Sequence, residues 1–380
     1  MTEKLYDADA YLFSFDATVV SCTAEGEFFS VVLDRTAFFP EGGGQGADRG
    51  TLNDLPVCHV RLADGVIYHR LATAIAPGTA VHGQVDEMTR LRRMQDHTGE
   101  HIFSGLVHSR FGYENVGFHL GDGEMTMDYS GELTAEQVSD LERDANLIIR
   151  QNRPVTCVYP DQATLDALSY RSKKELTGPV RIVTVEGVDV CACCAPHVST
   201  TAQVGTLVIT DRVRWKGGVR LHARCGADAF DWLDLLRRDE NALSSLFSAP
   251  RGQIFPAAEK LSEENKELHR QLSELRREQA FSRVEAFSPK VADGLLCLAG
   301  ADGNLLREAA LAFAQKCTGV AVCVTPDGCG LRYAMASAED LSVRANEICT
   351  ALNGKGGGDR RLRQGRFNCD LAAAEAYFAE

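Results

Sequence analysis

The chain has 380 residues, 44% of them hydrophobic, and a formal net charge of -13 at pH 7 from 40 Lys and Arg against 53 Asp and Glu. Such a length allows two or three domains, and the apolar fraction is large enough for each to have a core. The acidic balance argues against a protein that coats nucleic acid over its whole surface, because phosphate binding needs Lys and Arg, but it is compatible with a local basic patch.

The N-terminus and the cysteines indicate the compartment. The first residues lack a basic start followed by an apolar stretch, so we expect no signal peptide. No run of about 18 apolar residues predicts a membrane span. The 13 cysteines are odd in number and scattered, which argues against a disulfide framework and favours a reducing compartment. We therefore expect a cytoplasmic protein without a membrane partner.

Residues 1–85 are typical of a small β-barrel domain. Apolar stretches such as 28–33 and 57–60 predict short strands, and glycine-rich turns such as 42–46 separate them. This pattern favours a barrel or a sandwich, and we take the barrel as the expected architecture.

Residues 86–228 predict a mixed α+β domain. The stretch 88–111 has apolar residues at helical spacing and no proline. A second helix is expected over 134–152, where Thr134 and Gln137 have the spacing of a capping box. Strands are expected near 179–185 and 205–209.

Residues 229–288 predict a helical linker with a short coiled-coil seam. Leu261, Asn265, Leu268, Leu272 and Leu275 recur at alternating steps of four and three. The seam covers about two heptads, so a helical hairpin within one chain and a homodimer zipper both remain open.

Residues 289–380 predict a small α/β domain. Stretches 294–299 and 320–324 are typical of buried strands, while 305–316 and 338–352 are typical of helices. The expected fold class is therefore an α+β multidomain protein with four parts, over residues 1–85, 86–228, 229–288 and 289–380.

Two pairs of metal-ligating residue types stand out. His97 and His101 are four apart on a predicted helix, so both imidazoles lie on one face. Cys193 and His197 are four apart in a turn that contains a proline and follows a strand. Together the pairs supply the four N and S ligands that zinc takes in a tetrahedral site. Cys193 is the expected thiolate, with Cys194 as the alternative.

The helix pair also has the spacing His-x-x-Glu-His of inverted metallopeptidases. In that interpretation Glu100 would be the general base. Such a peptidase needs an acidic ligand further along the chain and has no use for Cys193 and His197.

A glycine-rich segment follows the first strands. Residues 42–44 are glycines, which let backbone N–H groups approach a ligand closely, and Gln45 offers an amide that can hold a carbonyl or a water. A tight turn between strands would explain the glycines equally well.

The last part of the chain has a basic, glycine-rich tail. Exposed glycines interleaved with cations suit a phosphate backbone; a solvated loop is the alternative. The residues that we expect to contact nucleic acid are Lys355, Gly356, Gly357, Gly358, Arg360, Arg361 and Arg363.

The order of these motifs is informative. A Thr-x-Phe-Phe-Pro-Glu-Gly-Gly-Gly-Gln segment at 36–45 precedes the His and Cys-His pairs. Lys-Gly-Gly-Val-Arg-Leu at 216–221 follows, and Gly-Lys-Gly-Gly-Gly at 354–358 comes after the helical linker. This series resembles the editing half and C-terminal domain of alanyl-tRNA synthetase, and most of all the freestanding alanyl-tRNA editing proteins of the long form. The resemblance covers nearly the whole chain.

The resemblance implies a reaction and a cofactor. The reaction is deacylation of tRNA(Ala) that carries serine or glycine, and the cofactor is one zinc ion held by His97, His101, Cys193 and His197. Thr36 and Gln45 would line the amino-acid pocket. Residues 86–228 would be the zinc-containing editing domain, and residues 289–380 a DHHA1-like tRNA-binding domain.

The chain departs from the family at one point. The family usually has Gly-Gly-Thr between the Cys and the His, where this chain has Cys-Ala-Pro, so the loop geometry stays open. Because the aminoacylating half of a synthetase is missing, we expect no ATP-dependent charging.

The mechanism has two open points. Four protein ligands would leave no position for water on the metal, so either one ligand dissociates or the metal positions the substrate. Glu100 is a candidate base, although on a helix it points about 100° away from His101. Three classes stay in play: a zinc-dependent aminoacyl-tRNA hydrolase, a tRNA-binding protein with a structural zinc, and a metallopeptidase.

Overall fold

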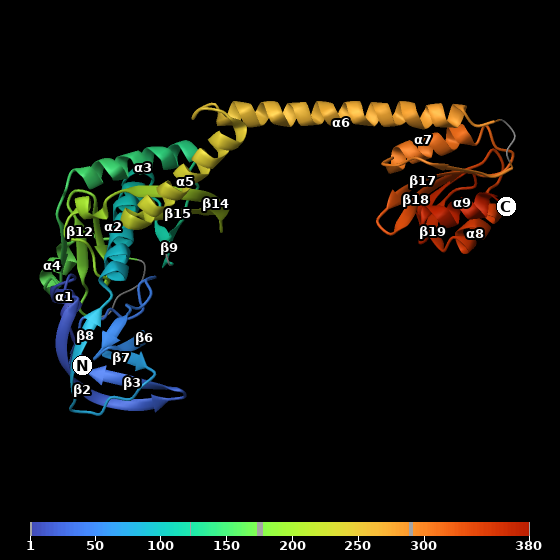
Figure 1. Ribbon diagram of the computed structural model, residues 1–380. Coiled ribbons are helices and arrows are strands. Elements are labelled where there is room, and N and C mark those ends of the chain that lie inside the picture. Colours follow the sequence, from blue (N-terminus) through green and yellow to red (C-terminus); the bar gives the residue numbers. More distant parts are fainter. Residues whose placement is uncertain (1, 122, 173–177, 289–291, 380) are drawn as a thin grey trace. The chain divides into compact units, whose positions relative to one another are not determined.

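The computed structural model describes residues 2–121, 123–172, 178–288 and 292–379. The chain divides into two compact units, Met1–Asn241 and Ala242–Glu380, coloured from blue to yellow and from yellow to red in Figure 1. Each unit is described by itself below. The finer division into four domains stays a prediction.

Six strands of the first unit close into a barrel in the order β2-β3-β7-β6-β5-β8. Alternation along the strands explains this: in β2, Phe15, Ala17 and Val19 are buried while the residues between them are exposed, so every second side chain enters the barrel core. The strands are β2 (Ser14–Glu25), β3 (Phe28–Leu33), β5 (Gly50–Leu52), β6 (Leu55–Ala63), β7 (Val66–Leu71) and β8 (Ala80–Val85). Three short elements flank them: β1 (Glu3–Lys4), α1 (Leu5–Ala8) and β4 (Arg35–Thr36).

Helix α2 (Glu87–Phe111) runs through the centre of the first unit. It begins at Asp86, whose side chain accepts from the Thr89 N–H, and ends at Gly112 in the left-handed conformation with φ 67°. Most of its residues from Arg90 to Val107 are buried. The helix is therefore packed on several faces and not on one face alone. This is the helix that the sequence predicts over residues 88–111.

Two sheets and a second helix complete the first unit. Helix α3 (Ala135–Arg150) has the capping box expected from Thr134 and Gln137. The four-stranded sheet has the order β14-β15-β10-β9, and the three-stranded sheet the order β11-β12-β13. Their strands are β9 (Asn115–Leu120), β10 (Met125–Tyr129), β14 (Leu207–Trp215), β15 (Gly218–Cys225), β11 (Val155–Val158), β12 (Ile182–Val185) and β13 (Asp189–Ala192). Short helices α4 (Gln162–Ala167) and η1 (Thr201–Val204) connect them.

A buried ion pair ties helix α2 to the barrel. Arg90 and Asp48 are 0% and 1% exposed at their side chains, and the Arg90 Nε donates to both Asp48 oxygens. The same guanidinium donates to the carbonyls of Ala10 and Ala37, and Asp48 accepts from the Phe39 N–H. Every charged group at this junction therefore has partners, which a buried pair requires.

Two long helices follow, α5 (Gly226–Phe247) and α6 (Ile254–Glu285). The leucines of the predicted seam are exposed: Leu261 by 54%, Leu268 by 63% and Leu275 by 62%. Within the second unit, no described segment covers these leucines; a hairpin with residues of the first unit stays a prediction. A homodimer through this linker or through the C-terminal unit stays a prediction.

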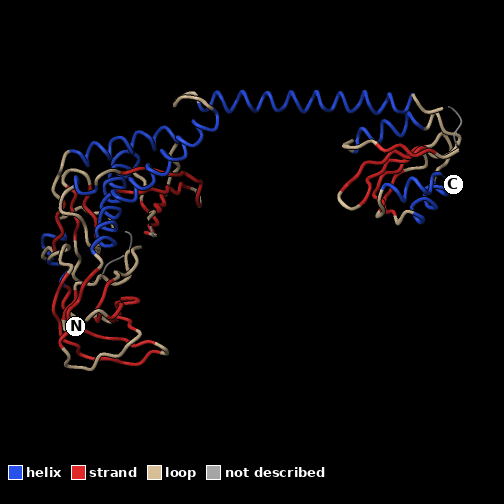
Figure 2. Tube along the Cα trace, viewed as in Figure 1, coloured by secondary structure: helices blue, strands red, loops and turns tan. Residues whose placement is uncertain are grey.

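The second unit contains a five-stranded sheet in the order β16-β17-β18-β20-β19. Figure 2 shows this sheet in red with helices on its faces. Strands β16 and β17 are parallel and the other pairs are antiparallel. The strands are β16 (Gly294–Cys297), β17 (Ala321–Asp327), β18 (Gly330–Ala336), β19 (Gly354–Gly358) and β20 (Leu362–Phe367). The helices are α7 (Gly303–Phe313), α8 (Ser342–Ala351) and α9 (Leu371–Ala379).

The basic tail is a β-hairpin rather than a loop. Its glycines form β19 at the edge of the sheet, paired with β20. Lys355 and residues 356–361 are exposed. The segment Gly354–Gly358 has no alternation of hydrophobic and polar residues, so the sequence does not predict this strand.

Two general expectations can be compared with the structure. In the part of the chain that the structure describes, none of the 13 cysteines forms a disulfide. Among the described residues, no helix combines the length and the apolar character that crossing a bilayer requires.

Replacing Arg90 by Met should lower the free energy of unfolding by about 3–5 kcal/mol, because Asp48 is then buried without its charged partner. Urea denaturation measures this. The matched control Arg143→Met removes an exposed arginine from α3 and should change the free energy by about 0.5 kcal/mol or less. Equal midpoints for the two variants would contradict the role of the ion pair.

Candidate metal centre

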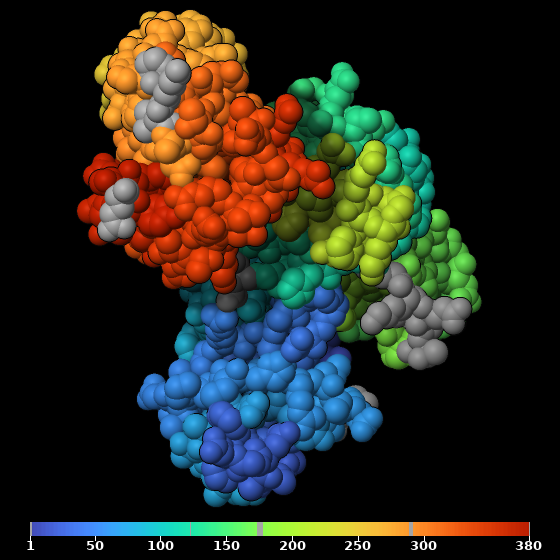
Figure 3. Space-filling view, turned by 90° about the vertical axis from the view of Figure 1, so that its right-hand side faces the viewer, coloured from blue at the N-terminus to red at the C-terminus, as the bar shows by residue number. Residues whose placement is uncertain are grey.

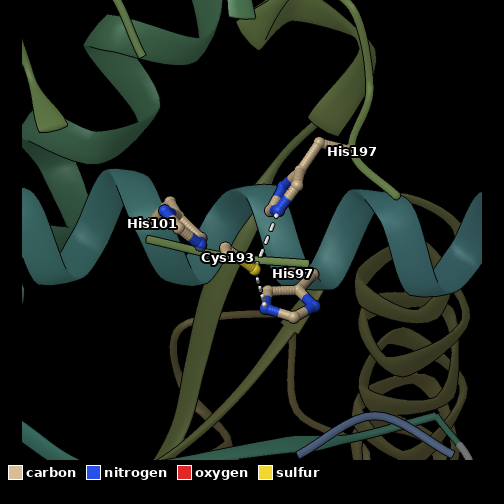
Figure 4. Close-up of side chains that lie close together, drawn as sticks. All are labelled: His97, His101, Cys193 and His197. Atoms are coloured by element: carbon tan, nitrogen blue, oxygen red, sulfur yellow. Dashed lines mark hydrogen bonds between the residues drawn. The ribbon is translucent and has the colours of Figure 1, made fainter. Parts of the chain in front are cut away.

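Four side chains from two distant segments converge beside helix α2. His97 and His101 project from one face of the helix, and Cys193 and His197 come from the turn after β13 (Figure 4). Cys193 Sγ lies 3.5 Å from His97 Nε2 and 3.4 Å from His197 Nε2. The four ligand atoms all lie within 4.8 Å of one another. One ion with bonds of about 2.0–2.3 Å can reach all four, as the spacing predicts.

Each imidazole is held from its far side. His97 Nδ1 donates to Gln45 Oε1 and His101 Nδ1 donates to Asp189 Oδ2, both at 3.0 Å. His197 Nδ1 lies 3.0 Å from Thr98 Oγ1. With Nδ1 engaged, Nε2 is the nitrogen left for a metal, and such outer partners are typical of metal-ligating histidines.

Burial keeps the Cys193 thiol and the His197 ring uncharged. Burial raises the pKa of the Cys193 thiol, and the neighbouring Cys194 raises it further. Burial also lowers the pKa of His197 well below its usual value, with His101 and His97 adding to the effect. Without a metal these groups are neutral, and an ion that binds the thiolate displaces its proton. Three imidazoles and one thiol are a donor set that suits zinc.

Asp189 links the cluster to a second cation. Its carboxylate accepts from His101 and from both Arg171 Nε and Arg171 Nη2 at 2.7 and 2.8 Å. Burial by itself would raise the pKa of Asp189, but the hydrogen bonds from His101 and Arg171 outweigh it and the pKa is lowered. The carboxylate is therefore a charged acceptor that fixes His101.

The structure distinguishes the neighbouring cysteines. Cys193 belongs to the cluster, whereas Cys194 is exposed and its Sγ lies beside Gly43. Arg181 shapes this turn: its Nη1 donates to the carbonyls of Cys193 and Ala195, and its own carbonyl accepts from the Cys193 N–H. Arg181 thus holds the Cys-Cys-Ala-Pro turn that departs from the family pattern.

The glycine-rich segment lies against the cluster. Gly44 has φ +83°, and a Cβ there would lie 2.4 Å from the Phe118 carbonyl oxygen, so only glycine fits. The turn brings Gln45 beside Leu120 of β9 and under His97. Gln45 is 1% exposed, and its Nε2 has no hydrogen-bond partner among the described residues. A buried donor without a partner next to a ligand cluster is available to a bound group.

Glu100 lies closer to the cluster than its place on the helix suggests. Its Oε2 is 3.8 Å from His101 Nε2, while Oε1 accepts from Ser104 and Asn115. The carboxylate is 1% exposed. The angle of about 100° between successive helix residues therefore does not exclude contact between the Glu100 carboxylate and His101.

Thr36 occupies a different environment, inside the barrel. Its hydroxyl lies 2.9 Å from His69 Nε2 and accepts from the Phe38 N–H. His69 Nδ1 donates to the Val31 carbonyl, so Nε2 must be the acceptor and Thr36 the donor. Burial lowers the pKa of His69 to about 4. None of the hydrogen bonds found for Thr36 in the described chain reaches the four ligands.

The residues predicted to bind nucleic acid lie in the second unit. Lys355 and Gly356–Gly358 are on β19, Arg360 and Arg361 are in the turn, and Arg363 is on β20. Arg363 donates to Asn346, and Arg360 lies 3.7 Å from Asp340.

A cavity lies beside Asp189. Its volume is about 690 Å³ and its lining includes Gly105, His108, Arg171 and Asp189. The four ligands do not line it, so it approaches the cluster only through Asp189.

Sequence reasoning missed four supporting residues: Thr98, Arg171, Arg181 and Asp189. Thr98 follows His97 directly and Asp189 precedes Cys191 by two, so proximity in sequence was the one signal available. Arg171 and Arg181 act through contacts between segments, which no local pattern encodes.

Two family models match parts of this chain. A family described as tRNA synthetases class II (A) matches residues 5–89, which contain the barrel and Gln45. A family described as the threonyl and alanyl tRNA synthetase second additional domain matches residues 180–222, which contain Cys193 and His197. The alanyl-tRNA editing protein Aarsd1 of Mus musculus is 29% identical over 98% of this chain and 96% of its own length. This chain is homologous to the alanyl-tRNA editing proteins.

Other relatives extend the homology. Aarsd1 of Bos taurus is 32% identical over 69% of this chain and 63% of its own length. The alanine–tRNA ligase of Thermococcus kodakarensis is 30% identical over 99% of this chain and 43% of the ligase, so the chain spans less than half of that ligase. Among solved structures, the C-Ala domain of Aquifex aeolicus alanyl-tRNA synthetase matches 23% of this chain and 86% of that chain, with 17% identity and a TM-score of 0.20.

Asp96 directly precedes the first ligand, and its carboxyl group has a raised pKa. It is 2% exposed, and its Oδ1 accepts from the Cys225 N–H at 2.7 Å. Burial, together with the charge of Asp228, raises its pKa to about 8. The unfolded chain loses this proton near pH 4, so between pH 4 and 8 the folded state binds a proton that the unfolded state does not.

The Asp96→Asn variant should therefore lose part of the pH dependence of folding. In the wild type, Asp96 makes the free energy of unfolding fall as pH rises from about 4 to 8, by a few kcal/mol over the whole window. Urea denaturation of both proteins at several pH values in that window, in the same metal state, measures the difference. Parallel pH profiles would contradict a raised pKa.

Proposed function

We propose that this protein hydrolyses the ester between a wrongly attached amino acid and tRNA(Ala), with serine or glycine as the amino acid and one zinc ion as cofactor. The observation that carries the proposal is the convergence of His97, His101, Cys193 and His197, with an unpaired Gln45 amide beside it. Homology to alanyl-tRNA editing proteins supports the substrate class.

The four side chains would hold the zinc ion, which can act as a Lewis acid or orient the substrate. In this proposal, Gln45 Nε2 donates a hydrogen bond to the ester carbonyl as negative charge develops on its oxygen. Its Oε1 is already engaged by His97, so the amide cannot turn without losing that bond. Fixed donors of this kind stabilise the transition state of acyl transfer.

Glu100 is the proposed general base. Its Oε2 would take a proton from a water as the water oxygen bonds to the ester carbon. The bond from that carbon to the ribose oxygen then breaks, and the proton passes to the ribose. Ser104 and Asn115 hold the other carboxylate oxygen, which fixes Oε2 on the side of His101.

Thr36 is the proposed selectivity residue. Its proton is directed to His69 and one lone pair is used by the Phe38 N–H, which leaves one lone pair on the hydroxyl oxygen. A seryl hydroxyl can donate to it, whereas an alanyl methyl cannot. Sites that bind a substrate hydroxyl discriminate strongly against analogues that lack it.

The β19–β20 hairpin is the proposed tRNA contact of the second unit. Lys355, Arg360 and Arg361 are exposed, and the glycines between them allow a phosphate backbone to approach closely. In a protein that acts on tRNA, this hairpin would bind the backbone without reading sequence.

Two other functions use the same residues. A tRNA-binding protein with a structural zinc would need all four ligands but no unpaired Gln45 amide. A peptidase of the inverted His-x-x-Glu-His type would need an acidic third ligand, whereas Cys193 and His197 complete this cluster. Both observations favour the hydrolase.

The purified protein should contain one zinc ion and release serine from Ser-tRNA(Ala). Cys193→Ala should lose zinc and reduce hydrolysis by at least about a hundredfold, because the thiolate and its position are removed. Cys194→Ala is the matched control and should retain both. Metal analysis and a deacylation assay measure this. Full hydrolysis by Cys193→Ala after chelation would make the zinc structural, and peptide cleavage that depends on Glu100 would favour the peptidase.

Replacing Gln45 by Met keeps the volume and removes the amide. We expect kcat to fall by about 10²–10³, the usual loss for one fixed donor to a developing oxyanion, with zinc content unchanged. Gln162→Met changes an exposed glutamine of α4 and should leave kcat unaltered. If Gln45→Met keeps wild-type kcat, the amide does not act on the ester.

A further inference from the structure

We infer that the β14–β15 hairpin of the first unit is a second RNA contact, which binds the backbone of the acceptor end near the metal centre. The inference rests on the proposed function for the identity of the RNA. The contact itself is argued from charge, aromatic surface and position. It is separate from the β19–β20 hairpin, which belongs to the other unit.

The hairpin concentrates positive charge on an acidic chain. Its strands and turn carry Arg212, Arg214, Lys216, Arg220 and Arg224 against one carboxylate, Asp211, while the whole chain has a net charge of -13. Such a local excess on an acidic protein is the expected footprint of a phosphate-binding surface.

Arg220 and Arg224 are paired with carboxylates, whereas Lys216 in the turn has no such partner among the described residues. Arg220 binds Asp128 through two hydrogen bonds of 2.6 and 2.7 Å, and Arg224 lies 3.4 Å from Glu124. Lys216 is exposed and forms no ion pair within the described ranges.

Arg214 is 85% exposed and lies 3.8 Å from Glu132, which is itself 64% exposed. An ion pair of that kind has little effect on either charge. Arg214 and Lys216 therefore keep their charges available for a ligand.

An aromatic ring lies between these cations. The Arg220 guanidinium is 3.8 Å from the Trp215 ring centroid, and Lys216 Nζ is 5.2 Å from it. Proteins that bind single-stranded RNA combine cations for the backbone with aromatic rings on which bases stack. Trp215 is partly exposed.

The turn holds these side chains in a fixed arrangement. Trp215 pairs with Gly218, and the two residues between them, Lys216 and Gly217, have φ of 44° and 84°. A two-residue turn with positive φ at both positions matches the twist of its strands. Little ordering is then needed on binding, which favours affinity.

The hairpin is connected to the metal centre by one row of the sheet. Arg212 pairs with Leu221, Leu221 with Met127, and Met127 with Phe118. The Phe118 ring lies 4.7 Å from the His97 ring. Three strand spacings separate Arg212 from Phe118, about 14 Å, and Arg214 and Lys216 lie two and four residues further toward the turn.

In Figure 3 the yellow-green part of the chain that contains β14 projects from the surface of the first unit. Its outer residues are thus open to a large ligand. In this proposal, an RNA chain whose last ribose lies at the metal centre runs along the protein surface to the hairpin, because Leu221 and Met127 between them are buried.

The test is the binding of an uncharged tRNA(Ala) transcript to the full chain at several salt concentrations. Arg214→Ala/Lys216→Ala should bind on the order of tenfold more weakly near 0.1 M salt, and the slope of log K against log salt should become shallower by about 1.4–1.8, as expected for two lost phosphate contacts. In deacylation of Ser-tRNA(Ala), KM should rise and kcat should not change.

Arg143→Ala/Arg150→Ala is the matched control. It removes the same charge from the exposed face of α3 and should leave affinity and slope unchanged. Trp215 offers a second measurement, because the chain has two tryptophans. RNA should quench the fluorescence of Trp232→Phe, which retains Trp215, and not that of Trp215→Phe.

The outcomes are distinguishable. A wild-type salt slope for Arg214→Ala/Lys216→Ala overturns the inference, even if the wild type hydrolyses Ser-tRNA(Ala). An effect equal to that of the α3 control also overturns it, because net charge alone would then be responsible. If the hairpin variant alters RNA binding but the wild type hydrolyses no mischarged tRNA, the hairpin contact stands and the proposed function fails.

Discussion

The buried pair of Arg90 and Asp48 is the constraint on which the site depends. It joins two parts with separate cores, the barrel and the body around α2. One turn further along the helix, Arg93 donates to the carbonyls of Gly46 and Ala47. Ala37 is held by Arg90 and Gly46 by Arg93. The segment between these two residues ends in Gln45. Charged groups without partners are costly in a dry interior, so this junction is held in one arrangement. That arrangement also fixes the position of the Gln45 amide.

The metal ligands are positioned by a second layer that comes from four different segments. Gln45 reaches His97 from the barrel, Thr98 reaches His197 from the helix itself, and Asp189 reaches His101 from β13 with Arg171 behind it. Arg181 fixes the turn that carries the thiol. Such a shell orients the rings before any ion arrives, so binding a metal needs little rearrangement of the protein.

Local patterns in the sequence carried the arrangement of α2, the capping box of α3 and the two ligand pairs, because each rests on spacing within one element. Features that depend on contacts between distant segments could not be predicted from the sequence. The choice of Cys193 over Cys194 depends on how Arg181 turns the loop. The return of Glu100 toward His101 depends on side-chain torsions held by Asn115 and Ser104. The strand formed by Gly354–Gly358 exists because β20 offers it a paired edge, which no glycine pattern indicates.

His69 has a consequence for how the barrel responds to acid. Its ring stays uncharged until the medium is close to pH 4, since nothing in the barrel interior would solvate a cation. The direction of its bond with Thr36 is therefore the same at neutral and at mildly acidic pH. Any preference that the threonine oxygen expresses toward a donor would persist through metabolic swings in acidity, although most histidines change state in that interval.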